Sequence, residues 1–119
     1  MLRYGSRRFL FPGDAEAAEE VASLGADLRA DVLKVGHHGS RTSSSVPFLD
    51  AVSPSIAVIS AGQGNRYGHP HAEAFSRLRG VRVYRTDRDG NVEVRTDGES
   101  LEVSLVDPPE PWRLRDCRP

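Results

Sequence analysis

The densest chemistry in this sequence is a pair of adjacent histidines, His37 and His38, which stand between Gly36 and Gly39. The pair directly follows residues 32–35, an apolar stretch that predicts a buried strand. Flanking glycines permit a sharp turn, and open α/β sheets place their sites at the ends of strands. We therefore expect the two imidazoles to face a cleft, although a polar turn at the surface would be the simpler arrangement.

Two further strand-like stretches also end in polar turns that contain glycine. Asp14 follows the stretch 8–11, and His69 and His71 come soon after the apolar stretch 56–60. Imidazole and carboxylate together suit a borderline divalent ion such as zinc or manganese. The three strand ends therefore predict one polar site, and metal-assisted hydrolysis is the leading hypothesis for its chemistry.

Length and composition are those of one ordinary globular domain. The chain has 119 residues, of which 38% are hydrophobic and 28% charged, and its apolar runs are far too short to cross a bilayer. A formal net charge of -1 argues against strong attraction of the whole surface to a polyanion, so any nucleic-acid contact must be local. Cys117 is the single cysteine, which excludes a disulfide within the chain.

Hydrophobic periodicity and turn residues predict strands that alternate with helices. The expected strands are a hairpin over 2–11 that turns at Gly5 and Ser6, then 31–35, 55–60 and 81–86, and a terminal antiparallel pair, 91–96 and 101–105. The expected helices cover 15–24, 47–52 and 70–78. A disordered tail is expected over 107–119.

The predicted helices make testable assignments for single side chains. Val21 and Leu24 share one face of the first helix, and Phe75 and Leu78 are expected on the buried face of the last. Asp14 stands at the start of the first helix, where aspartate is among the best N-caps. Capping is therefore the plain alternative to a metal-ligand role for this carboxylate, and both roles can coexist.

Three segments together resemble a known family. They are residues 11–16, residues 30–43, and residues 57–60 leading into 65–71, within a similarity that covers roughly 2–98. They resemble the carboxyl half of a metallo-β-lactamase-fold domain, specifically the one attached to ComEC-type competence proteins. The resemblance implies an α/β fold of the α+β type, one half of a four-layer αββα sandwich, with a mixed sheet and helices mainly on one face. Residues 1–106 would form this partial domain.

The resemblance also implies roles for individual residues. It places a metal-bridging carboxylate on Asp14 and a metal-ligand histidine on the pair His37 and His38, of which His38 is favoured because the following glycine lets it turn inward. It implies a catalytic or supporting role for His69, whereas His71 is expected at a helix start in solvent. Side chains that could contact phosphate or substrate, or simply belong to loops and caps, are Ser40, Arg41, Asn65, Arg66 and Tyr67.

One departure from the family limits what the chain can do alone. The family's His-x-His-x-Asp-His ligand run has no match here, so the amino-terminal half of the domain is expected to be absent. Zinc usually needs three or four protein ligands, whereas Asp14 and one histidine supply about two. We expect weak metal binding and no activity from the chain by itself. We also expect self-association through the apolar face left bare, where residues such as Phe9, Phe11, Leu33 or Val58 need cover.

The resemblance implies a function for the parent protein. It would be a metal-dependent hydrolase of phosphodiesters, acting on DNA during competence-linked uptake, attached to a membrane with this domain outside the cytoplasm. The alternative from another class is a non-catalytic remnant or interaction module that keeps the half-fold without a working metal site.

Overall fold

The computed structural model describes residues 1–106, so the predicted tail, with Cys117, lies outside the described residues. Seven strands are present: β1 Leu2–Tyr4, β2 Arg7–Leu10, β3 Val32–Lys34, β4 Ile56–Ile59, β5 Arg82–Arg85, β6 Asn91–Thr96 and β7 Leu101–Val106. The helices are α1 Ala17–Ser23, α2 Val46–Val52, α3 Ala72–Arg77 and the single turn α4 Thr86–Asp89, with a tight turn, η1, at Gly36–Gly39. The expected order of strands and helices is confirmed.

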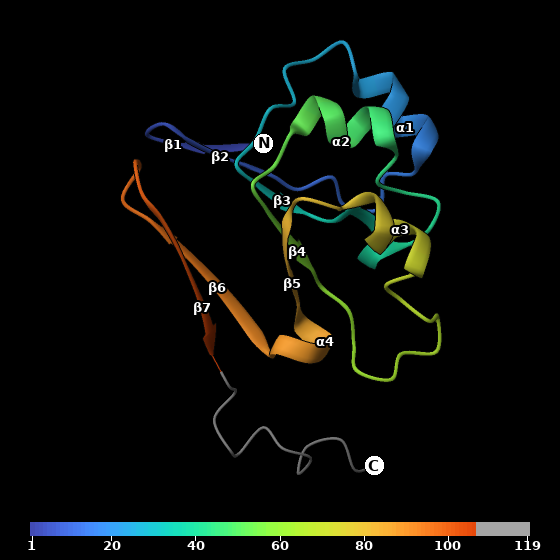
Figure 1. The fold of residues 1–119 in the computed structure, drawn as a ribbon. Coiled ribbons are helices and arrows are strands. Elements are labelled where there is room, and N and C mark those ends of the chain that lie inside the picture. The colour runs from blue at the N-terminus through green and yellow to red at the C-terminus, as the bar shows by residue number, and fades with distance from the viewer. Residues whose placement is uncertain (107–119) are drawn as a thin grey trace.

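Five strands form one mixed sheet in the order β1-β2-β3-β4-β5 (Figure 1). The edge strand β1 is antiparallel to β2, and the other neighbours are parallel. Connections between parallel strands are almost always right-handed, so a sheet that grows in one direction collects its helices on one face. Helices α1, α2 and α3 lie on that face, which confirms the α+β class and the mixed sheet. Assignment to half of an αββα sandwich stays a prediction.

The core lies between the sheet and these helices. Alternate strand residues point into it, because successive side chains of a strand face opposite sides. Leu33, Val35, Ala57 and Ile59 are fully buried there, and Leu78 of the α3 end closes the cluster. Leu33 had been expected on the bare face, and that prediction is wrong because the alternation of β3 turns it toward the helices.

The burial of side chains in two helices departs in part from their apolar patterns, although the expected burial of Leu78 is confirmed. In α1 the buried side chain is Glu20, 1% exposed, whereas Val21 is 57% exposed. In α3 the buried residues are Ala74 and the C-cap Leu78, whereas Phe75 is 42% exposed and lies under the Arg85 guanidinium at 5.7 Å from the ring centre. Both helices are short, so a single polar or cationic partner decides which side chain is buried more than the spacing of the apolar residues does.

The buried carboxylate of Glu20 joins α1 to the start of α2. Its two oxygens accept hydrogen bonds from the backbone N–H groups of Ser44, at 2.5 Å, and Ser45, at 2.8 Å. The first N–H groups of a helix have no partner inside the helix and carry its positive dipole end. Glu20 therefore binds the N-cap residue Ser45 and the residue before it, and fixes the loop that leads into α2.

The other face of the sheet is crossed by the hairpin β6–β7, which leaves the sheet after α4 (Figure 1). The hairpin tip is tied to the β1–β2 turn, where the backbone N–H of Ser6 donates to the Gly98 carbonyl at 2.7 Å. A Cβ on Gly5 would collide with the Gly98 backbone, so this close approach requires glycine. The hairpin is a strap held at both ends.

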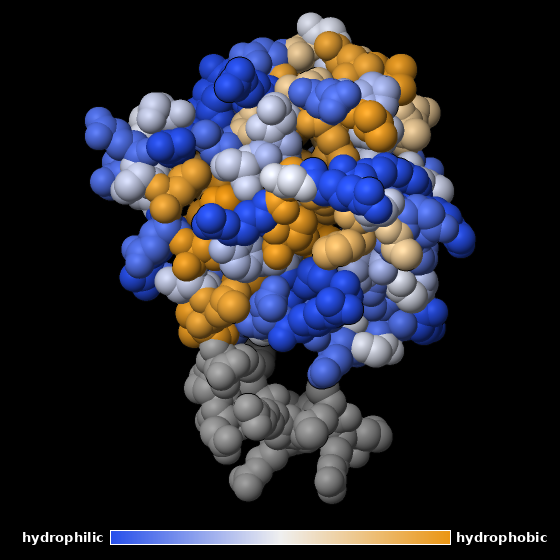
Figure 2. All heavy atoms as spheres, viewed as in Figure 1, coloured by the Kyte–Doolittle hydropathy of each residue, from blue (hydrophilic) through white to orange (hydrophobic). Residues whose placement is uncertain are grey.

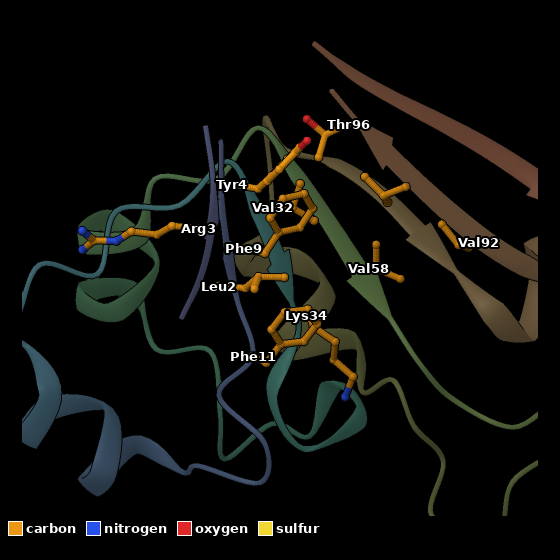
Figure 3. A pocket seen from close by; sticks show the side chains of 11 residues that line it. Leu2, Arg3, Tyr4, Phe9, Phe11, Val32, Lys34, Val58, Val92 and Thr96 are labelled. Atoms are coloured by element: carbon orange, nitrogen blue, oxygen red, sulfur yellow. The ribbon is translucent and has the colours of Figure 1, made fainter. Parts of the chain in front are cut away.

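Between strap and sheet lies a hollow of about 590 Å³ (Figure 3). Phe9, Phe11, Val32 and Val58 line it from the sheet, and Val92 faces them from the hairpin. Apolar side chains accordingly interrupt the polar surface in Figure 2. Phe11 is 58% exposed, so the strap covers this face only in part.

Among the described residues, no helix is both long and apolar enough for a membrane crossing.

Glu20→Ala should lower the free energy of unfolding by about 2–5 kcal/mol, because it leaves two backbone donors without partners in a buried place. Glu20→Gln, which can accept through one oxygen, should lie between wild type and Glu20→Ala. Urea unfolding measures both. Asp50→Ala is the control, since the Asp50 side chain is exposed on α2 and makes no hydrogen bond among residues 1–106. A similar loss of stability in that variant would contradict the role of Glu20.

The partly covered face should make the chain self-associate at micromolar concentration. An exposed apolar patch of this kind is unusual on a monomer, and burying one large side chain is worth about 1.5–3 kcal/mol. Phe11→Asp should shift sedimentation toward the monomer, whereas Val21→Asp, an equally exposed position on α1, should not. A wild-type monomer that binds no hydrophobic dye would show that the strap suffices.

Candidate functional site

The predicted meeting of three strand ends is present. Backbone contacts join the turn after β2, the η1 turn after β3 and the loop after β4. The N–H of His37 donates to the Gly13 carbonyl at 2.9 Å, and the N–H of His71 donates to the Gly39 carbonyl at 2.9 Å. His38 Nδ1 lies 2.8 Å from the Ser60 carbonyl oxygen. Parallel strands end at the same edge of a sheet, which is why these segments converge.

The η1 turn holds two histidines in a conformation that side chains rarely adopt. His37 has φ 49° and ψ 42°, and His38 has φ 55° and ψ 24°, both in the left-handed region. Such residues are costly by about 1–3 kcal/mol each and cluster at functional sites. Gly39 follows with φ 81°, and a Cβ there would stand 2.6 Å from Pro70 Cβ. The turn therefore needs glycine at this position.

All four histidines of the sequence gather at this edge of the sheet. His69 is at the centre: its ring centre lies 5.8 Å from that of His37, 6.2 Å from that of His38 and 4.7 Å from that of His71. The predicted clustering of the two histidine motifs is thus present in the fold. Their hydrogen bonds show that the four imidazoles have different roles.

His38 is the imidazole best prepared to bind a ligand. Its Nδ1 is within hydrogen-bonding distance of the Ser60 carbonyl, an acceptor, so Nδ1 carries the proton and Nε2 has a free lone pair. This is the arrangement that protein zinc ligands use, with one nitrogen held by a carbonyl and the other on the metal. The side chain is also exposed.

The His37 side chain is less exposed than that of His38, and one of its ring nitrogens lacks a hydrogen-bond partner. Its Nδ1 is buried without a hydrogen bond among the described residues and lies 3.4 Å from Glu16 Oε1. An orphaned ring nitrogen beside a carboxylate could carry a proton or face a cation. His37 thus stays a candidate ligand together with His38, and the geometry favours His38.

His71 does not point freely into solvent, and that expectation is wrong. Its Nδ1 accepts the backbone N–H of Arg41 at 3.0 Å, so Nε2 carries the proton and donates to the Tyr67 carbonyl at 3.0 Å. The expected helix start is confirmed, since His71 is the N-cap residue of α3. The ring bridges two loops, and neither nitrogen is free for a ligand.

The pKa of His69 is lowered, first by burial and then by the neighbouring His71, His37 and His38. Burial disfavours the charged imidazolium, and a second positive charge in the cluster would be repelled. His69 is therefore neutral near pH 7, where it can accept a hydrogen bond or bind a cation. It is unsuited to holding phosphate by charge.

Asp14 is exposed in the turn before α1. It is not the helix N-cap: Glu16 occupies that position and forms a capping box with Glu19, whose carboxylate accepts the Glu16 N–H at 3.0 Å. The capping alternative for Asp14 is therefore wrong. Burial lowers the pKa of Lys34, and the nearby carboxylate of Asp14 opposes part of that lowering.

The fit of these groups to a metal ion is partial. Among residues 1–106, no three His, Cys, Asp or Glu side chains are placed so that they could hold one ion. His38 Nε2 is ready for a cation, and Asp14 and His37 belong to adjoining turns. We derive no chemical step through a metal from this incomplete set.

The predicted phosphate contacts divide into held and free groups. Ser40 is 5% exposed, and its hydroxyl is shared with Thr42 Oγ1 at 2.9 Å. The Asn65 amide organises its own loop: its oxygen accepts the N–H groups of Tyr67 and His69, and its nitrogen donates to the carbonyls of Gly62 and His69. Both side chains are thereby engaged within the fold.

Arg41, Arg66 and Tyr67 are exposed beside the histidines. The Arg66 guanidinium donates to the Tyr67 hydroxyl at 2.9 Å and lies 5.1 Å from the ring centre of Tyr67. No side-chain hydrogen bond of Arg41 occurs among the described residues, although its backbone is bonded on both sides. These three side chains can approach a ligand.

Sequence reasoning missed two residues that hold the site. Arg77 of α3 donates to the carbonyls of Ser43, at 2.8 Å, and Arg41, at 3.0 Å. Glu20 binds the same loop from α1. Nothing local marks either residue, because an arginine or glutamate on a helix is ordinarily solvated. Only their positions opposite the loop make them structural.

In metal-free protein with EDTA, one histidine should titrate below the ordinary pKa of about 6.5, and its NMR signal should vanish in His69→Gln. The folded state then binds fewer protons than the unfolded chain. His69 thus favours folding above that ordinary value, and its contribution falls as pH drops below about 6.5. Four histidines titrating at or above 6.5 would contradict the cluster.

Comparisons with known proteins show that the chain is similar to one segment of several competence proteins. It is 41% identical over 108 residues to ComE operon protein 3 of Bacillus subtilis, covering 87% of this chain and 14% of the relative. It is 44% identical over 91 residues to competence protein ComA of Neisseria gonorrhoeae, covering 72% and 13%. It is 37% identical over 114 residues to recombination protein 2 of Haemophilus influenzae, covering 93% and 14%.

No protein-family model and no solved structure matches the chain. The chain spans about one seventh of the length of the curated relatives that it matches. Similarity at this level over most of the chain shows common ancestry with one segment of each relative. The chain is therefore a homologue of a segment of these proteins, and the similarity supports its place in a competence-protein family.

Proposed function

We propose that this chain is the histidine-bearing part of a metal-dependent phosphodiesterase that acts on DNA in competence. The single observation that carries the proposal is the state of His38, whose Nδ1 is held by the Ser60 carbonyl, so that Nε2 has a lone pair for a ligand at the edge where the strands end. The names of the relatives add the competence setting. Hydrolysis and the metallo-β-lactamase half-fold are part of the proposal.

The proposal gives each group of this chain a task. His38, with Asp14 and His37 beside it, offers donors for zinc or manganese, which when bound lowers the pKa of water and neutralises phosphate charge. Arg41 and Arg66 are the exposed cations that can hold phosphate oxygens. His69, neutral at pH 7, can accept a proton or hydrogen bond. The remaining metal ligands come from groups other than residues 1–106.

Zinc or manganese titration of the chain by calorimetry should show weak binding, because an incomplete ligand set leaves the ion largely hydrated. His38→Ala should abolish it. His71→Gln is the control, since both nitrogens of His71 are already bonded within the fold. Submicromolar binding of two ions per chain, or equal loss in both variants, would contradict the assignment of ligands.

Hydrolysis can be tested in a longer protein. This chain would replace the matching segment of ComE operon protein 3, to which it is 41% identical, with and without H38A. We expect metal-dependent cleavage of DNA that H38A removes while the thermal unfolding midpoint changes little. Cleavage unaffected by H38A would overturn the proposal.

A second function, a non-catalytic interaction module, is favoured by one observation. The sheet face under the strap has a partly open apolar hollow, which suits contact with another protein layer. Metal content decides between the two: a longer protein that contains this segment and binds no divalent ion would favour the module.

A further inference from the structure

The long loop between β4 and α3 (Figure 1) bounds a second hollow, next to the histidines. It has a volume of about 250 Å³ and is lined by His38, Tyr67 and His69, with Asn65 and Gly62 beneath. Hollows that enclose drug-sized ligands measure roughly 300–1,000 Å³. This one suits a smaller group, and three of its lining side chains are aromatic rings.

The rings that line the hollow are nearly parallel. The plane of Tyr67 makes an angle of 22° with that of His69, at 5.7 Å between ring centres, and the plane of His38 makes 23° with the same ring, at 6.2 Å. A flat aromatic group that stacks on Tyr67 is therefore also nearly parallel to the His69 ring. Such offset stacking is a favoured arrangement of aromatic rings.

The platform is rigid before any ligand arrives. Asn65 uses all its hydrogen-bonding capacity on the backbone of this loop, including the N–H groups of Tyr67 and His69. His71 then ties the Tyr67 carbonyl to the Arg41 N–H. Two polar side chains thus hold a Tyr–His pair at the surface, and a preordered site loses less entropy on binding.

Packing in the core does not explain why so many hydrogen bonds hold the loop that carries Tyr67. It is 60% exposed, and the buried core cluster does not include it. Its neighbour Arg66 donates to the Tyr67 hydroxyl and lies over the ring, so a cation stands beside the aromatic surface. Aromatic rings that bind bases next to an arginine that binds phosphate are the usual components of single-strand binding surfaces.

We infer that Tyr67 and His69 form a stacking site for one unpaired base of single-stranded DNA, with Arg66 beside the rings to bind the adjoining phosphate. The inference rests on the proposed function, and it specifies the form of the substrate. Bases inside a duplex are covered by their neighbours and cannot lie on a protein ring. The site therefore selects single strands over duplex.

The test is fluorescence anisotropy with a labelled oligothymidylate of about 12 nucleotides, a length within the range that single-strand binding domains occupy. The whole chain is titrated at low salt with EDTA. Tyr67→Ala should weaken binding roughly 5- to 150-fold, because stacking of one base on an aromatic ring contributes on this scale. Tyr67→Phe keeps the ring and should bind within about twofold of wild type.

Tyr4→Ala is the matched control, since Tyr4 is 57% exposed and lies in the hollow under the hairpin, away from the histidines. It should bind as wild type does, and the duplex of the same length should bind more weakly than the single strand. Thermal unfolding of each variant checks folding, and Tyr67→Leu, which keeps an apolar side chain but no ring, should behave as Tyr67→Ala.

Three results would overturn the inference: equal binding by Tyr67→Ala and wild type, equal binding of duplex and single strand, or no binding of the oligothymidylate by wild type. Loss in Tyr67→Phe as large as in Tyr67→Ala would also overturn it, because the Arg66 contact rather than the ring would then matter. EDTA separates this titration from the metal experiment, so either can fail without the other.

Discussion

The left-handed turn that carries His37 and His38 is the constraint on which this structure depends. Two consecutive residues with positive φ are unfavourable by themselves, so the surrounding segments must hold them. They do so from three directions: the Gly13 carbonyl binds the His37 N–H, the Ser60 carbonyl binds the His38 ring, and the His71 N–H binds the Gly39 carbonyl. The first contact comes from the β2–α1 connection, and the other two come from the β4–α3 connection. The order of the strands thus brings together the segments that hold the turn. The turn in its place sets the orientation of the His38 ring and the nitrogen that carries its proton.

A second set of polar contacts fixes the loop that follows this turn. Glu20 reaches it from α1, Arg77 reaches it from α3, and the His71 ring joins it to the Tyr67 loop. A buried carboxylate is stable only when its oxygens are satisfied, and here they accept the N–H groups of Ser44 and of Ser45, the N-cap residue of α2. The same groups that stabilise the helix layer therefore position Arg41 beside the histidines. Stability and site geometry are coupled, so substitutions at Glu20 or Arg77 should affect both.

The two faces of the sheet are stabilised differently. The helix face is a closed core in which Leu33, Val35 and Ile59 are fully buried. The opposite face has only the β6–β7 strap, which is anchored at its tip by the contact between Gly5 and Gly98. A strap anchored by backbone contacts leaves room beneath it, and Phe11 stays largely exposed. Part of this sheet face is thus available to another layer, while the histidine site lies at the edge of the sheet.

The sequence alone determined the order of strands and helices and the meeting of the glycine-rich turns, because apolar periodicity and turn residues act locally and parallel strands end at one edge. The mixed sheet was an implication of the family resemblance. It also singled out the histidine motifs, and the fold brings all four rings together. It could not assign the rings their roles. Whether His38 or His71 has a free nitrogen depends on which carbonyl or N–H lies opposite, and those partners are 22 and 30 residues away in sequence. For the same reason the sequence could not show that Glu20 is buried in α1 while its apolar neighbour Val21 is exposed. Periodicity ranks side chains by their hydrophobicity, whereas only the packed structure brings an unsatisfied helix N-terminus to a particular carboxylate.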